Sequence, residues 1–113
     1  MKRGEIWTLA GGGDFAGKPR PALIVQNDEF EDLNSATVCM FTTNPTVSDI
    51  RVAVEPSSTN GLDVTSHIMV DKISSVWRHR LRGPIGSLSD GDMERLNRAL
   101  MVFLGLAGTP SDR

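Results

Sequence analysis

The stretch Pro21-Ala22-Leu23-Ile24-Val25-Gln26 decides how this chain folds. Its apolar character is continuous, which predicts a strand that is buried on both faces. A glycine-rich segment, residues 11–17, comes before it, and a polar and acidic segment, residues 27–35, comes after it. Both flanking segments are typical of loops, so the strand has clear limits.

Further short segments with strand character occur on either side of this one. They cover residues 6–9, 36–42, 51–55, 67–73 and 76–81. Alternation in residues 36–42 places Met40 and Thr42 on one face and Phe41 and Thr43 on the other. Pro45 ends that strand, since proline cannot donate to a ladder, and residues 83–84 predict a bend.

The end of the chain changes to a helical period. Ser89 is a good N-cap, with Asp90 and Asp92 in the first turn. Apolar residues then recur at helical spacing, which predicts an amphipathic helix over about residues 90–106, packed on the sheet. They are Met93, Leu96, Ala99, Leu100, Phe103 and Ala107. Residues 108–110 end the helix, and a frayed tail is expected over 108–113.

These elements predict one domain over residues 1–113, with strands over about residues 4–82 and one C-terminal helix. The fold class is mostly β with a C-terminal α-helix. Several short strands closed by one helix indicate a small barrel, and not a doubly wound α/β sheet. A length of 113 residues suits one hydrophobic core.

Composition restricts the chemistry. The formal net charge is −2, whereas proteins that wrap duplex DNA are usually basic, so a nucleic-acid contact would need a local group of Arg and Lys. Cys39 is the only cysteine, which excludes an intrachain disulfide and a cysteine-based zinc site. No cofactor and no metal are expected. The N-terminus has no apolar run of the secretory kind and no segment has membrane-spanning length, so a cytoplasmic protein without a membrane partner is expected.

Four blocks, in order, resemble the MazF/PemK family of toxins. The first is residues 2–7, and the second, residues 17–28, resembles the family signature G-x-x-R-P-x-L-V-[IL]. The third is the strand end Phe41-Thr42-Thr43-Asn44, and the fourth runs from Gly61-Leu62 to residues 69–73. Order and spacing agree over nearly the whole chain, and the terminal helix agrees as well.

The resemblance implies an SH3-like barrel, usually a homodimer, that is a sequence-selective endoribonuclease silenced by a cognate antitoxin protein. It implies that Arg20 and Thr42 are catalytic, with Asp71 as a helper. The implied reaction is cleavage of single-stranded RNA by its own 2′-OH, without a metal, and DNA is reached only indirectly through an antitoxin complex. The chemistry of Arg20 fits this role: Pro19 restricts its own φ, Pro21 biases Arg20 toward an extended conformation, and a guanidinium can bind phosphate through two hydrogen bonds.

RNA-binding candidates lie on both sides of the catalytic positions. They are Phe15, Lys18, Thr43, Arg78 and Arg80. Together with Arg82, the last two alternate, so they are expected to share one strand face as a basic stripe. His67 and His79 are a further acid–base possibility, although nothing in their spacing indicates that they meet.

Two alternatives stay open. One is a CcdB-like inhibitor that binds DNA gyrase on a related fold, and the other is a family member that keeps only binding. Met69 bears on the second, since some PemK-like relatives carry an arginine there, and this departure favours an Arg–Thr catalytic set.

Overall fold

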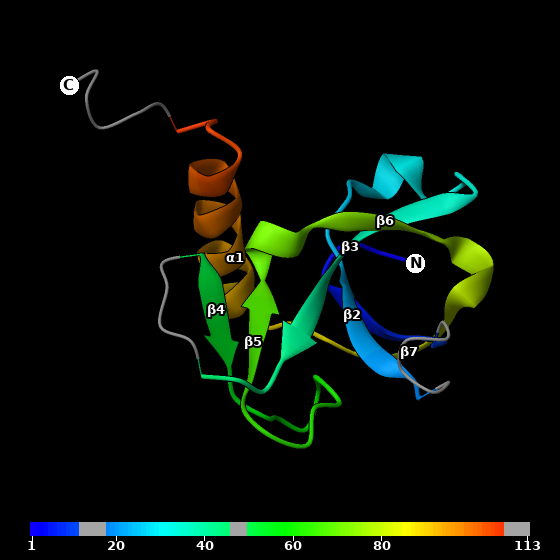
Figure 1. Ribbon diagram of the computed structural model, residues 1–113, viewed down its shortest axis with the longest axis horizontal. Helices are drawn as coiled ribbons and strands as arrows, with labels where there is room; N and C mark the ends of the chain where they lie inside the picture. Colours follow the sequence, from blue (N-terminus) through cyan, green and yellow to red (C-terminus); the bar gives the residue numbers. More distant parts are fainter. Residues whose placement is uncertain (12–17, 46–49, 108–113) are drawn as a thin grey trace.

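The computed structural model describes residues 1–11, 18–45 and 50–107. In these residues the chain forms an antiparallel sheet, short 3-10 helices and one α-helix (Figure 1). The strands are β1 (Glu5–Leu9), β2 (Arg20–Ile24), β3 (Ser35–Thr42), β4 (Arg51–Val54), β5 (Ser66–Met69), β6 (Ser74–Trp77) and β7 (Leu81–Ser87). The helices are η2 (Asp28–Phe30), η3 (Val70–Lys72), η4 (Arg78–Arg80) and α1 (Asp90–Phe103).

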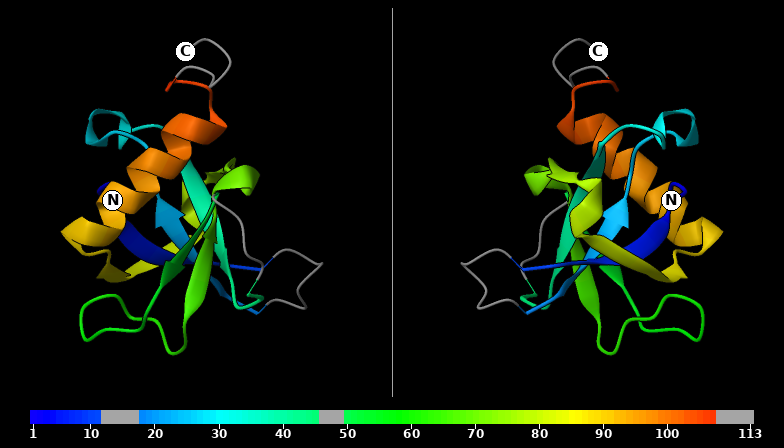
Figure 2. Two further views of the ribbon diagram at one scale, coloured as in Figure 1. Left: turned by 90° about the vertical axis from the view of Figure 1, so that its left-hand side faces the viewer. Right: turned by 90° about the vertical axis from the view of Figure 1, so that its right-hand side faces the viewer.

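The sheet curls because the two halves of the long strand β3 pair with different strands. Its order is β4-β5-β3-β2-β1-β7, and β6 also pairs with β3. The first half of β3, from Ser35 to Val38, pairs with β6, whereas Phe41 and Thr42 at its end pair with β5. The result is an SH3-like fold in which α1 lies against one side of the strands, beside β4 (Figures 1 and 2).

Strand β2 lies in the middle and is buried on both faces, as predicted. Leu23 packs into the cluster that includes Leu96 and Leu100 of α1. Ala22 and Ile24 point the other way, into a second cluster with Leu81. Successive side chains of β2 therefore pack into two different apolar clusters, one on each face of the sheet, and this packing fixes the position of β2.

Two predicted strands end earlier than expected. The segment predicted over residues 67–73 is β5 followed by η3, and the one predicted over 76–81 is β6 followed by η4. The expected bend at residues 83–84 lies inside β7, so the strands extend to Ser87 and not to residue 82. Strand β7 tolerates Pro84 because it is an edge strand, and its register against β1 shifts between Ile6 and Thr8.

The helix begins as predicted and ends earlier. The Ser89 hydroxyl accepts a hydrogen bond from the Asp92 backbone N–H at 3.1 Å, which confirms the N-cap. The helix ends at Phe103 because Gly105 takes a φ of 75°, a conformation that commonly closes helices. Phe103, expected in the core, is 41% exposed, so its prediction is wrong. The tail predicted over residues 108–113 lies outside the described residues.

In the part of the chain that the structure describes, no helix is long and apolar enough to cross a membrane.

Candidate functional site

Arg20 and Thr42 line one small pocket of about 160 Å³. Arg20 is the first residue of β2 and Thr42 the last of β3. These strands pair with Ala22 opposite Met40, so two residues further along the same register bring Arg20 opposite Thr42, just beyond the last paired residues. Residues opposite each other in an antiparallel pair project to the same face, and both side chains are therefore presented together.

The hydroxyl of Thr42 is oriented by its own backbone. Its Oγ1 accepts a hydrogen bond from the backbone N–H of Asn44 at 3.2 Å. The hydroxyl proton remains available to a ligand, because a hydroxyl has one donor besides its acceptor lone pairs. On the other side of β3, Thr42 pairs with His67 of β5, whose side chain is half-buried.

The other residues that line this pocket are two apolar residues and two residues with a hydroxyl group. Thr43 is exposed and lines the pocket beside Thr42, as do Pro21 and Phe41. Ser66, which the sequence did not single out, also lines it, but its Oγ donates to the Val64 carbonyl at 3.0 Å. An exposed guanidinium beside an oriented hydroxyl is a chemical arrangement suited to a phosphate.

Asp71 is held elsewhere, in an ion pair. Arg51 of β4 donates from Nε to Oδ1 at 2.7 Å and from Nη2 to Oδ2 at 3.0 Å. The hydrogen bond from Arg51 is the main cause that lowers the pKa of Asp71 below its ordinary value. Asp71 lies in η3 and does not line the pocket of Arg20 and Thr42.

The predicted basic stripe does not form. Arg78 and Arg80 belong to η4 and Arg82 to β7, so the three are not on one strand face. The cause is the 3-10 turn, whose side chains do not alternate as strand side chains do. Arg80 Nη2 donates to the Ala10 carbonyl at 2.8 Å, which ties η4 to the end of β1.

Two other predicted RNA-binding residues lie before β2. Lys18 is exposed, two positions ahead of Arg20. Phe15 lies outside the described residues. The two histidines do not meet in one pocket, because His67 is in β5 whereas His79 stacks on Trp77 at a centroid distance of 6.5 Å.

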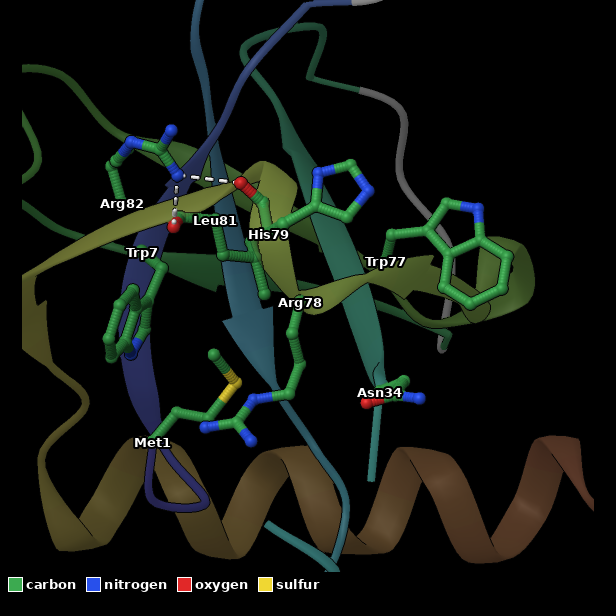
Figure 3. A pocket seen from close by; sticks show the side chains of 8 residues that line it. All are labelled: Met1, Trp7, Asn34, Trp77, Arg78, His79, Leu81 and Arg82. Carbon is green, nitrogen blue, oxygen red and sulfur yellow. Dashed lines mark hydrogen bonds between the residues drawn. The ribbon is translucent and has the colours of Figure 1, made fainter. Parts of the chain in front are cut away.

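A larger pocket of about 800 Å³ opens between the N-terminus, β1 and η4 (Figure 3). It is lined by Met1, Trp7, Asn34, Trp77, Arg78, His79, Leu81 and Arg82. A partial signal for this pocket is present in the sequence, where Trp77 stands beside the basic residues of the segment 78–82.

The described residues contain neither a reactive thiol nor a group of side chains that could hold a metal ion. Burial raises the pKa of the Cys39 thiol to about 11, so it stays protonated near neutral pH. Across residues 1–11, 18–45 and 50–107, no three His, Cys, Asp or Glu side chains gather in a group that could hold a metal ion.

Known proteins match this chain over nearly its whole length. The profile of the family described as "PemK-like, MazF-like toxin of type II toxin-antitoxin system" matches residues 2–104. The chain is 46% identical over 109 residues to a probable endoribonuclease MazF of Mycolicibacterium smegmatis, covering 96% of this chain and 100% of that protein. It is 32% identical over 116 residues to endoribonuclease MazF9 of Mycobacterium tuberculosis, covering 94% and 98%.

Solved structures agree in fold. A mycobacterial endoribonuclease, in complex with its cognate antitoxin, superposes with a TM-score of 0.78 at 24% identity, covering 94% of this chain and 96% of that one. The family profile, over residues 2–104, spans all the strands and α1. The chain therefore belongs to the PemK-like, MazF-like toxins of type II toxin–antitoxin systems.

Proposed function

We propose that this toxin is an endoribonuclease that cleaves single-stranded RNA without a metal, and that Arg20 and Thr42 are its catalytic residues. The observation that carries the proposal is that both side chains line one pocket, at the adjacent ends of β2 and β3. Relatives at 46% and 32% identity carry the name endoribonuclease MazF, which supports the same activity here.

The proposed reaction is a transesterification. The RNA's 2′-OH attacks the adjacent phosphorus, a P–O bond forms, and the bond to the 5′-oxygen breaks in line. The 2′-OH loses its proton and the leaving 5′-oxygen gains one, which gives a 2′,3′-cyclic phosphate and a 5′-hydroxyl end. The nucleophile belongs to the substrate, so the enzyme contributes alignment and charge stabilisation.

Each catalytic side chain has a defined part in this step. The Arg20 guanidinium, which stays charged, donates to the non-bridging phosphate oxygens while negative charge accumulates on them. Thr42, with Oγ1 already accepting a hydrogen bond from the Asn44 N–H, donates a hydrogen bond from its hydroxyl to the same phosphate. Lys18 and Thr43 flank these positions and contact the RNA backbone.

Asp71 enters the proposal as a positioning residue. Its carboxylate is engaged by Arg51 through two hydrogen bonds, and its pKa is lowered, so it is a poor proton donor at neutral pH. We assign to Asp71 the role of holding η3 against β4. Strand β5, which directly precedes η3, pairs with the end of β3 that carries Thr42.

We also propose that the chain acts as a homodimer and is silenced by a cognate antitoxin in the cytoplasm, where messenger RNA is present. The end of α1 supplies a surface for the second copy: Val102, Leu104 and Leu106 are 60%, 49% and 70% exposed. Beside them lies an apolar pocket of about 340 Å³ that Leu100 and Ile73 help to line. Burial of such an apolar patch is favourable. The mycobacterial endoribonuclease of the same fold has been solved in complex with its cognate antitoxin.

The test is cleavage of a long single-stranded RNA in EDTA, with analysis of the new ends. Discrete fragments with 5′-hydroxyl ends support the proposal, provided that Arg20→Ala and Thr42→Ala are folded and inactive. Failure of folded wild-type protein to cut several RNAs contradicts it. A gyrase supercoiling assay then tests the CcdB-like alternative.

A further inference from the structure

Trp77 is a large aromatic residue left open to solvent. It ends β6, is 59% exposed, and lines the pocket of about 800 Å³ shown in Figure 3. The imidazole of His79 stacks with the indole at a centroid distance of 6.5 Å and an interplanar angle of 14°. Two nearly parallel rings at a pocket wall form a flat platform of the kind on which nucleobases stack.

The same pocket carries positive charge. Arg78 and Arg82 line it, and no carboxylate is found among its described lining residues. The Arg82 guanidinium is fixed at the rim, since Nη1 donates to the His79 carbonyl at 2.6 Å and to the Leu81 carbonyl at 3.1 Å. The Arg78 guanidinium has no hydrogen bond or ion pair with the described residues, so it is available to an anion.

This pocket lies one strand away from the Arg20 pocket. Leu9 of β1 pairs with Arg20 of β2 on one side and with Leu81 of β7 on the other. Directly paired residues of antiparallel strands project to the same face, and neighbouring strands are about 4.8 Å apart. Leu81 lines the aromatic pocket, so one RNA strand that crosses the end of β1 reaches both sites.

We propose that the pocket of Trp77 and Arg78 is an accessory nucleotide subsite, where a base of the RNA stacks on Trp77 and a neighbouring phosphate binds Arg78. This inference rests on the proposed ribonuclease function. It adds a binding position away from the scissile phosphate, and it assigns a role to an aromatic pair that the Arg20–Thr42 chemistry does not use. Flat rings beside Arg78, which has no carboxylate partner among the described residues, favour a nucleotide over an acidic peptide, which has fewer planar groups.

The test measures binding separately from cleavage. The probe is a labelled single-stranded RNA made of 2′-O-methyl nucleotides, which lacks the attacking 2′-OH. Trp77→Ala is expected to weaken its binding about tenfold or more, because base stacking on an aromatic side chain is worth that much. Trp77→Phe should recover most of the affinity, and Arg78→Ala should weaken binding and reduce its salt dependence.

Arg98→Ala is the matched control, because this exposed arginine of α1 lines neither pocket. It removes the same charge as Arg78→Ala and should leave RNA affinity within about twofold. Thermal unfolding of each variant checks the fold. Cleavage of ordinary RNA by Trp77→Ala should lose kcat/KM through a higher KM, because the contact removed is one that binds the substrate.

Three outcomes overturn the subsite. The first is unchanged RNA affinity for folded Trp77→Ala, and the second is an equal loss for Arg98→Ala. The third is a loss only of antitoxin binding, which would identify a protein site. If wild-type protein binds the probe through Trp77 yet cuts no RNA, the proposed cleavage fails while the subsite stands, so the two failures are distinguishable.

Discussion

Arg51 and Asp71 are joined by two parallel hydrogen bonds, at 2.7 Å and 3.0 Å, between β4 and η3. Their side chains are only 15% and 23% exposed. Arg51 lowers the pKa of Asp71, and Asp71 raises the pKa of Arg51, since each favours the charged form of the other. The pair ties η3 to the strand that also contacts α1.

Asp71→Asn should therefore reduce the free energy of unfolding near pH 7 by about 1–2 kcal/mol, between the values of exposed and buried pairs. The pKa of Asp71 is lower in the folded state, so its contribution is present above the unfolded-state pKa and is lost as pH falls through the folded-state pKa. Urea unfolding of both proteins at neutral and acidic pH measures this, and the difference should shrink in acid.

Asp63→Asn provides the control for charge alone, because Asp63 is exposed and lies outside any ion pair among the described residues. A stability difference that stays constant down to strongly acidic pH would contradict the ion-pair explanation. If Asp71→Asn instead abolishes RNA cleavage without changing stability, Asp71 acts directly on the substrate and the positioning role is wrong.

Arg20 and Thr42 should respond differently to conservative changes. Arg20→Lys keeps a cation but loses the planar fork, so kcat/KM should fall by about 10–100-fold. Thr42→Val keeps the shape and removes the hydroxyl, with an expected loss of about 100–1,000-fold in kcat, as for other lost transition-state donors. Thr42→Ser should retain activity within about tenfold.

Thr8→Val is a suitable comparison, since Thr8 is a strand threonine that lines neither pocket. Steady-state cleavage of one defined RNA in EDTA gives all four values. Equal activity of Thr42→Val and wild type would exclude the Thr42 hydroxyl from the reaction.

The sequence predicted those features that depend on local pattern. The continuous apolar run of β2 and the Ser89 cap are both confirmed, because burial on two faces and an N-cap hydroxyl are properties of adjacent residues. The 3-10 turns at residues 70–72 and 78–80 were missed. Where a strand stops pairing depends on residues distant in the sequence, and the local pattern does not contain that information. An arginine partner for Asp71 was possible from the sequence, but Arg51 could not be identified as that partner, because the two residues are 20 positions apart.

The apolar end of α1 allows a test of the proposed dimer. Leu106→Asp changes a side chain that is 70% exposed, so it should preserve the folded subunit while it disrupts a dimer formed through this surface. Val64→Asp, at a position 53% exposed between β4 and β5, makes the same kind of change outside the α1 surface and should leave the proposed dimer intact. Sedimentation velocity over a range of concentrations separates the two states. A dimeric Leu106→Asp protein would place the interface elsewhere.

Gly91 and Gly105 form a matched pair at the two ends of α1, since a Cβ added at either meets no atom within 4 Å. Only Gly105 has a positive φ, at 75°. Gly105→Ala should therefore destabilise the protein by about 1 kcal/mol, because an alanine is strained in this conformation. Gly91→Ala should stabilise it by up to about 1 kcal/mol through helix propensity. Urea unfolding of both variants decides the matter: opposite signs support backbone control of where α1 ends, whereas two changes of the same sign would show that the Gly105 turn is not what terminates the helix.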